Sequence, residues 1–237
     1  GDMACGEYGE GKMSEPNEIL NKIYIYLNPN NKNKKIKALV TAGPTKEFID
    51  PVRYLSNESS GKQGYEIARS LSERGFETTL ISGPTNLKVE KNIKLIKVET
   101  AEEMFRATQK SLPTDIAIFS AAVSDFRVKD ISDTKIKKKD NLVINLEKNV
   151  DILSYVSNHN SMRPKLVIGF AAETNNLDEN AINKMMSKNC DWIIANDISK
   201  NNSGFNSDYN EVTIHYKDFK KKKEKLAFKK KSLISDE

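Results

Sequence analysis

The stretch spanning residues 40–68, which reads VTAGPTKEFIDPVRYLSNESSGKQGYEIA, constrains the fold more than any other part of the chain. An apolar run precedes it, a loop opens at Gly43-Pro44, and residues 59–64 lead into a helical pattern of apolar positions. This order predicts a strand, a polar loop and a helix. A glycine-bearing loop at a helix start directs unpaired backbone N–H groups and the positive end of the helix dipole at one point, which favours a phosphate.

The loop carries neither of two well-known phosphate-binding motifs. It lacks the G-x-x-x-x-G-K-[ST] spacing of a Walker A loop and the G-x-G-x-x-G fingerprint of dinucleotide-binding folds. Its glycines and serines are equally compatible with an ordinary turn followed by helix N-cap chemistry.

Strand and helix patterns alternate along the rest of the chain. Apolar runs predict strands at residues 36–41, 78–82, 93–98, 115–123, 165–172 and 191–195. Helices are expected at residues 63–73, behind a capping box at Thr100–Glu103, and at residues 177–187. The alternation predicts an α/β, Rossmann-like, mostly parallel sheet with helices on both faces. Residues 212–216 alternate like an antiparallel edge strand.

The most apolar strand, residues 115–123, turns polar at Ser124-Asp125. Ligands of open α/β sheets bind outside the carboxyl ends of the strands, so Asp125 lies where a nucleotide contact is expected. Small side chains at Ala121 and Ala122 would let a base or a ribose approach the backbone. A purely structural explanation, in which the alanines pack against a helix and Asp125 is a cap, fits these residues equally well.

Residues 128–149 differ from the rest and predict a basic hairpin or flap. Lysines cluster at residues 135–139, a turn is expected at Asp140-Asn141, and Leu142, Ile144 and Leu146 alternate with other residues. Alternation places Lys135 and Lys137 on one face, where they could meet a triphosphate. A solvated hairpin tip is the competing explanation.

Bulk composition excludes several classes of protein. With 237 residues, 38% hydrophobic and 30% charged, the chain predicts a globular protein, and no apolar run is long enough for a transmembrane helix. We expect a cytoplasmic location and no membrane partner. The net charge is +5, but the lysine clusters that produce it lack regularly interleaved aromatic residues, so no nucleic-acid partner is expected. Two cysteines and two histidines give no disulfide framework and no zinc spacing.

Between about residues 37 and 218 the chain contains, in order, the blocks GPT, DPVRY, SNESSGKQG, SAAVSDFR with KIKK, NVDIL, GFAAET, IIANDIS and FNSDYN. These blocks resemble one enzyme family, the phosphopantothenate-cysteine ligases of coenzyme A biosynthesis. The resemblance implies a ligase that joins 4'-phosphopantothenate to L-cysteine through an acyl-cytidylate. CTP would be split to CMP and pyrophosphate with Mg²⁺ present, in a homodimer. The flap and the strand at residues 212–216 are the expected dimer surface.

The resemblance also implies roles for individual residues. Asn57 matches an asparagine that contacts the acyl intermediate, Arg53 an arginine of the substrate site, and Lys135 the flap lysine of the amide-forming step. The implied CTP-binding residues are Phe119, Ser120, Ala121, Asp125, Lys135, Val150, Asp151, Ile152, Leu153, Phe170, Lys184 and Lys188. The implied phosphate and substrate loop comprises Gly43, Thr45, Ser59, Ser60, Gly61 and Gly64. Metal ligands are not identified.

Residues 1–35 form a separate segment in this interpretation, and residues 36–237 form the ligase domain. Met3-Ala4-Cys5-Gly6 and the glycines after it resemble the C-terminal flap of a flavin-dependent decarboxylase that is fused ahead of the ligase in many bacteria. The segment would then be a linker and a remnant of that flap. Three other hypotheses compete for the main domain: a nucleotide-binding regulatory module without catalysis, a nucleotide-dependent oxidoreductase, which lacks its glycine fingerprint here, and a nucleic-acid binder led by charge.

Overall fold

The computed structural model describes residues 35–237 except residues 139–140, 174, 198–207, 219–220 and 222. The predicted decarboxylase-like segment, with Cys5, therefore lies outside the described residues, as do Asp140 of the expected flap turn and much of the FNSDYN block. No described helix combines the length and the apolar character that crossing a bilayer would require.

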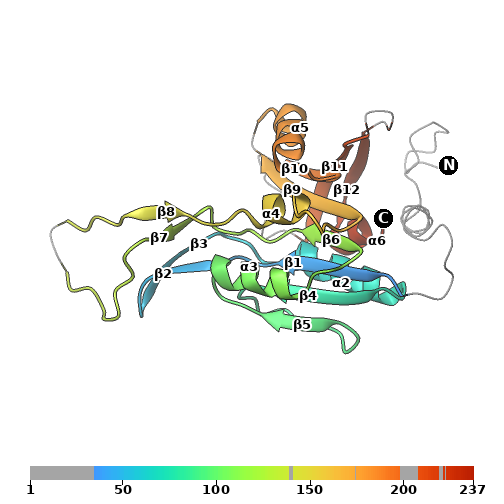
Figure 1. The fold of residues 1–237 in the computed structure, drawn as a ribbon. Coiled ribbons are helices and arrows are strands. Elements are labelled where there is room, and N and C mark those ends of the chain that lie inside the picture. Colours follow the sequence, from blue (N-terminus) through green and yellow to red (C-terminus); the bar gives the residue numbers. More distant parts are fainter. Residues whose placement is uncertain (1–34, 139–140, 174, 198–207, 219–220, 222) are drawn as a thin grey trace.

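An eight-stranded sheet forms the body of the molecule, with the strand order β12-β11-β10-β9-β6-β1-β4-β5 (Figure 1). The strands from β10 to β5 run parallel to one another, and β11 and β12 are each antiparallel to their neighbours. Their bounds are β1 Lys37–Ala42, β4 Glu77–Ser82, β5 Lys94–Lys97, β6 Ile116–Phe119, β9 Leu166–Glu173, β10 Trp192–Asp197, β11 Tyr209–Tyr216 and β12 Glu224–Lys230. The predicted mostly parallel α/β sheet is confirmed.

Helices cover both faces of the sheet because alternate strand residues face opposite sides. Ala38 and Val40 of β1 belong to a core shared with α2 (Lys62–Glu73), which packs beside α6 (Lys231–Asp236). Leu39 faces the other way, into a core shared with α3 (Ala101–Lys110), α4 (Ile152–Ser157) and α5 (Leu177–Lys188). A predicted helix start is also confirmed, since the Thr100 hydroxyl accepts a 3.1 Å hydrogen bond from the Glu103 N–H within a capping box.

The predicted polar loop after β1 is wrong in part, because it contains a hairpin. Strands β2 (Lys46–Asp50) and β3 (Arg53–Ser56) pair with each other around an Asp50-Pro51 turn. The Asp50 carboxylate accepts hydrogen bonds of 2.9 Å from the N–H groups of Val52 and Arg53, which closes the turn. The hairpin base is held by Glu47, a buried carboxylate that accepts from Ala101 N–H at the start of α3.

The prediction of an antiparallel edge strand at residues 212–216 is wrong only in its position, because the strand is antiparallel but does not lie at the edge. Strand β11 lies between β10 and β12, and Val212 and Ile214 pack with Leu226 and Ile234 in a third apolar cluster. The lysine-rich C-terminal segment, whose order the sequence did not settle, supplies β12 and α6. Its many lysines make this segment look like a solvated tail, but Leu226 of β12 is buried while its neighbours along the strand are exposed or half-buried.

The basic flap is a hairpin at its base. Strand β7 (Phe126–Val128) pairs antiparallel with β8 (Leu146–Lys148), and β7 lies beside β2. Together with the β2–β3 hairpin, the described residues between 126 and 148 project from the body as an extended arm (Figure 1). The described residues between β7 and β8 form no strand. Lys135 and Lys137 are exposed on either side of half-buried Ile136.

Candidate nucleotide site

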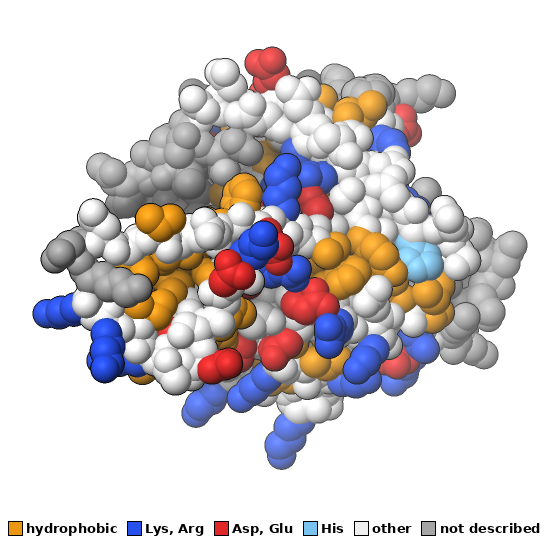
Figure 2. All heavy atoms as spheres, turned by 60° about the vertical axis from the view of Figure 1, so that its left-hand side comes forward, with side chains coloured by type: hydrophobic (Ala, Val, Ile, Leu, Met, Phe, Trp, Pro, Cys, Tyr) orange, Lys and Arg blue, Asp and Glu red, His pale blue; other side chains and the backbone are white. Residues whose placement is uncertain are grey.

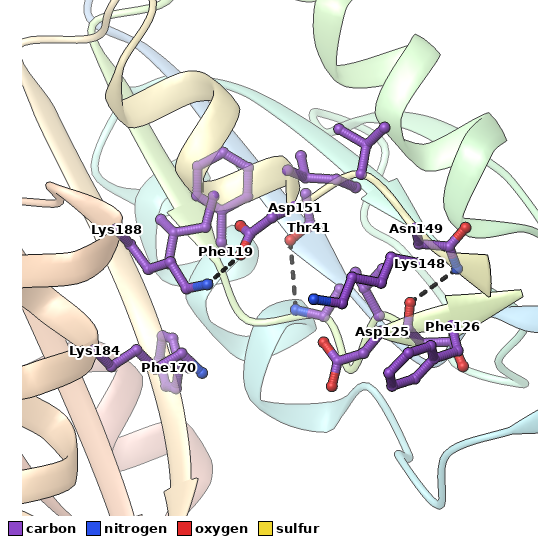
Figure 3. Close-up of a pocket in the computed structure, with 16 residues that line it drawn as sticks. Thr41, Phe119, Asp125, Phe126, Lys148, Asn149, Asp151, Phe170, Lys184 and Lys188 are labelled. Atoms are coloured by element: carbon purple, nitrogen blue, oxygen red, sulfur yellow. Dashed lines mark hydrogen bonds and ion pairs between the residues drawn. The ribbon is translucent and has the colours of Figure 1, made fainter. Parts of the chain in front are cut away.

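A cavity of about 580 Å³ lies at the carboxyl ends of β1, β6 and β9, where ligands of open α/β sheets bind (Figure 3). Its wall comes from the loop after β6, from the segment that joins β8 to α4, and from one side of α5. The lining residues are Thr41, Phe119, Ala121, Val123, Ser124, Asp125, Phe126, Lys148, Asn149, Val150, Asp151, Ile152, Leu153, Phe170, Lys184 and Lys188.

Three ammonium groups surround this cavity. Lys184 and Lys188, one helical turn apart on α5, reach in from one side, and Lys148 of β8 reaches in from the opposite side (Figure 3). Two carboxylates, Asp125 and Asp151, share the wall, so the lysines outnumber the acids. This excess of positive charge within a partly enclosed space favours a polyanionic ligand.

Asp151 links Lys188 of α5 to the helix that forms the floor of the cavity. Its carboxylate caps α4 by accepting a 2.7 Å hydrogen bond from Ser154 N–H, and it pairs with the Lys188 ammonium at 2.5 Å. Helix α4 lies close to β9 because Gly169 has no side chain: a Cβ there would meet Leu153 at 2.7 Å and Ile193 at 2.8 Å. The NVDIL block therefore positions both the cap and the cavity floor.

Asn149 ties the two halves of the cavity wall together. Its side-chain amide donates a 2.9 Å hydrogen bond to the Ser124 carbonyl, and its backbone N–H donates to the Asp125 carbonyl at 2.9 Å. These bonds join the loop after β6 to the end of β8. Antiparallel pairing of β7 with β8 continues from this point, which brings Lys148 opposite Phe126.

Most of the residues predicted to bind CTP line the cavity. They are Phe119, Ala121, Asp125, Val150, Asp151, Ile152, Leu153, Phe170, Lys184 and Lys188. Ser120 does not, because its hydroxyl donates a 2.7 Å hydrogen bond back to the Thr41 carbonyl. Sequence reasoning missed Thr41, Val123, Ser124, Phe126, Lys148 and Asn149. Val123, Ser124, Phe126 and Asn149 lie within blocks already identified and could have been included, whereas Lys148 reaches the cavity only through the pairing of β8 with β7.

The three residues predicted to be catalytic lie outside the cavity lining. Asn57 is exposed, and its amide donates a 3.0 Å hydrogen bond to the Ala122 carbonyl, next to the cavity wall. Arg53 pairs with Asp50 on the β2–β3 hairpin and donates to the Ile136 carbonyl at 2.9 Å. Lys135 is exposed on the arm. The structure therefore places Asn57 beside the cavity, and it places Arg53 next to the flap segment that carries Lys135.

The predicted phosphate loop leads into α2 through left-handed glycines. Gly43 and Gly61 have φ values of 77° and 76°, a region that other residues rarely adopt, and no side chain caps the helix start. The hydroxyls of Ser59 and Ser60 accept long hydrogen bonds, of 3.4 Å from Gly61 N–H and 3.5 Å from Lys62 N–H. Thr45 is buried, and its hydroxyl accepts a hydrogen bond from Ser124 N–H.

Two other kinds of active site receive no support from the described part of the chain. Burial raises the pKa of the Cys190 thiol to about 11, so this cysteine is protonated at neutral pH and is a poor nucleophile. No group of three or more His, Cys, Asp or Glu side chains among the described residues could hold a metal ion by itself.

Fold and cavity together define a Rossmann-like α/β protein with a cationic ligand pocket at the carboxyl ends of its parallel strands. The chain belongs to the family described as the DNA/pantothenate metabolism flavoprotein C-terminal domain, which matches residues 33–237.

Individual relatives agree with this family. The chain is 44% identical over 224 residues to the coenzyme A biosynthesis bifunctional protein CoaBC of Haemophilus influenzae, covering 94% of this chain and 56% of that protein. The crystal structure of a CoaBC C-terminal domain superposes with a TM-score of 0.72 at 37% identity, covering 87% of this chain and 93% of that one.

A third relative shares the fold alone: Cab2 with the H337A substitution, in complex with phosphopantothenate-cysteine, is 16% identical with a TM-score of 0.68, covering 92% of this chain and 90% of that one. These comparisons confirm the family resemblance and the fold class predicted from the sequence. The chain spans about half the length of the curated relatives it matches.

Proposed function

We propose that this chain is a ligase of coenzyme A biosynthesis that joins 4'-phosphopantothenate to L-cysteine through an acyl-cytidylate, with CTP as the activating nucleotide. The observation that carries the proposal is the cavity itself, in which Lys148, Lys184 and Lys188 surround a space at the strand ends. The relatives named CoaBC support assignment to this pathway.

The reaction needs two displacements. In the first, a carboxylate oxygen of phosphopantothenate attacks the α-phosphorus of CTP, a P–O bond forms, and pyrophosphate leaves. In the second, the amine of cysteine attacks the acyl carbon, a C–N bond forms, the acyl C–O bond to CMP breaks, and the amine loses a proton. A carboxylate is a poor electrophile, and nucleotidyl transfer gives it a good leaving group.

Cationic groups assist both displacements because negative charge develops on phosphate oxygens. In our proposal Lys184, Lys188 and Lys148 contact the triphosphate. Phe119 of β6 and Phe170 of β9 provide apolar walls for the cytosine and the ribose.

Asn57, beside the cavity at Ala122, would contact the acyl group. Lys135 would assist the second displacement when the arm brings it to the intermediate, and the left-handed glycine loop before α2 would accept the substrate phosphate.

Magnesium fits this arrangement only as a partner of the triphosphate. The described residues hold no cluster of three acidic or imidazole ligands, whereas Mg²⁺ is commonly held by substrate phosphates, water and one or two carboxylates. Asp125 on the cavity wall, and Asp151 if released from Lys188, are the carboxylates available for this role. The ion would neutralise charge on the triphosphate.

We also propose a homodimer that assembles through the arm. Large apolar side chains on the arm are exposed, among them Val52 at 59%, Ile131 at 58% and Val143 at 82%. Figure 2, in which the arm end of the molecule comes forward, shows hydrophobic patches around a central group of acidic and basic side chains. Strand β11 is interior to the sheet, so the arm alone remains of the predicted dimer surface. Exposed apolar patches of this kind mark interaction surfaces.

The remaining half of the matched relatives' length supports a fused flavin-dependent decarboxylase in the full-length protein, which would supply the neighbouring step of the pathway. A cytoplasmic location is consistent with that role.

Pyrophosphate release tests the proposed function directly. The purified chain is incubated with phosphopantothenate, Mg²⁺ and either CTP or ATP, and cysteine is then added. We expect pyrophosphate with CTP only when phosphopantothenate is present, and CMP only after cysteine is added. A regulatory module without catalysis, which no feature of the cavity favours, would release no pyrophosphate with either nucleotide.

A further inference from the structure

A carboxylate on the arm connects two segments that are far apart in the sequence. Asp50 lies at the tip of the β2–β3 hairpin, yet only 1% of it is exposed. Its Oδ1 accepts the N–H groups of Val52 and Arg53, while its Oδ2 accepts from the Arg53 guanidinium and, at 3.1 Å, from the N–H of Ile136. These hydrogen bonds lower the pKa of Asp50, chiefly through Arg53, so the buried carboxylate stays ionised at neutral pH.

Arg53 binds the same flap residue as Asp50, so Ile136 is held at two points; this pair of contacts is called the grip. The same guanidinium that pairs with Asp50 donates a 2.9 Å hydrogen bond to the carbonyl of Ile136. Both backbone polar groups of one flap residue are therefore bonded to the Asp50–Arg53 pair, which lies more than 80 positions earlier in the chain. A third bond, from Ser132 N–H to the Ile49 carbonyl, holds the flap to β2 nearby.

The grip determines which way the flap lysines face. Ile136 is half-buried where it is held, and Lys135 and Lys137 on either side of it are exposed. A shift of the flap by one residue would place a lysine in the half-buried position that Ile136 now occupies. Holding Ile136 by its N–H and its C=O excludes that shift.

We propose that Asp50 is a positioning residue of the ligase: with Arg53 it latches Ile136 and thereby presents Lys135 for the amide-forming step. The inference rests on the proposed function, since it assigns Lys135 to the second displacement. Asp50 itself is buried beneath the hairpin turn and acts only through Lys135.

Asp50→Asn is the informative substitution because it keeps the size of the side chain and removes its charge. An asparagine has one carbonyl oxygen, so it cannot accept from the hairpin turn and from Ile136 N–H together. Asp133→Asn is the matched control, since Asp133 is an exposed aspartate of the same flap. Arg53→Lys is a second variant, which keeps the positive charge but loses the planar fork that reaches Asp50 and Ile136 together.

Two readouts separate the latch from the function. Hydrogen exchange reports the protection of the Ile136 amide, and single-turnover kinetics report pyrophosphate release and CMP release separately. In Asp50→Asn we expect exchange at Ile136 to accelerate about 10- to 100-fold, as loss of a charge-assisted hydrogen bond implies. Pyrophosphate release should stay within about threefold, while CMP release falls about tenfold or more and the acyl-cytidylate accumulates. Asp133→Asn should match the wild type in every readout.

Two kinds of result would contradict the proposal. Unchanged exchange at Ile136 overturns the latch, and faster exchange with equal losses in both steps, or with no loss, overturns the positioning role. Should Asp50→Asn fail to fold by circular dichroism, Arg53→Lys decides between these outcomes by the same readouts. If the wild type releases no pyrophosphate, the proposed function fails on its own and the exchange measurement still decides whether the latch exists.

Discussion

A single methyl group added at Gly64 should displace α2 from the sheet beneath the predicted phosphate loop. The helix passes so close to β1 and β6 that a Cβ at Gly64 would lie 2.5 Å from Ser120 Oγ, 2.6 Å from Ala42 Cβ and 3.1 Å from the Thr41 carbonyl oxygen. Real Cβ atoms essentially never show contacts under 3.0 Å; the Ala42 side chain cannot rotate away, and the Ser120 hydroxyl is held by its hydrogen bond to the Thr41 carbonyl. Gly64→Ala must therefore shift the helix, the strand or both.

The net cost follows from two opposing contributions. Overpacking of a tight contact costs about 1–3 kcal/mol, and contacts this short belong at the upper end of that range. Replacing glycine by alanine within a helix stabilises it by about 1 kcal/mol. The sum predicts a loss of about 1–2 kcal/mol in the free energy of unfolding, which corresponds to a Tm lower by about 2–8 °C for a domain of this size.

Urea unfolding followed by the fluorescence of Trp192, the only tryptophan, measures this loss. Removing the Ser120 hydroxyl should relieve one of the two short contacts, so Gly64→Ala should cost at least about 0.5 kcal/mol less in a Ser120→Ala background. Gly75→Ala is the control: Gly75 has φ +84° with nothing within 4 Å, so its cost should be the same in both backgrounds. A stabilised Gly64→Ala protein, or full additivity with Ser120→Ala, would refute the close-packing argument.

The other predictions concern the cavity, the flap and pH. Lys184→Ala should weaken CTP binding about tenfold or more, measured by calorimetry, while Lys165→Ala, at the opposite end of β9, should bind normally; equal affinities would remove Lys184 from the site. Lys135→Gln should release pyrophosphate but accumulate an acyl-cytidylate detectable by mass spectrometry, and normal turnover would disprove its role. Burial lowers the pKa of His215, so the unfolded chain binds the proton more readily and stability should fall as pH drops below about 6.5. His215→Gln should reduce this fall in the free energy of unfolding, measured by urea unfolding at a series of pH values. A fall as steep as that of the wild type would contradict the prediction.

Much of the fold could be predicted because its signals are local. The capping box at Thr100, the spacing of Lys184 and Lys188, and the apolar strand runs each act within a few residues, and the structure contains all three. The polar end of the central strand indicated Asp125 for the same reason, since the carboxyl end of a parallel strand is defined by the strand itself.

Features that depend on distant pairing were not predictable in this way. Strand β12 reads EKLAFKK, a short apolar run between charged residues, and only its pairing with β11 distinguishes it from a solvated tail. Lys148 reaches the cavity because β8 pairs with β7, and the sequence pattern does not specify that register. The grip of Asp50 on Ile136 spans 86 positions, so the DPVR motif suggested a substrate contact for Arg53 and gave no sign of the flap.

A crystal structure of the protein with CTP and Mg²⁺ tests the central claim most directly. We predict electron density for the triphosphate between Lys184, Lys188 and Lys148, with the cytosine ring between the ends of β6 and β9 and with Asn57 at the mouth of the cavity. A nucleotide bound elsewhere, with these lysines remote from it in every subunit, would contradict the proposal.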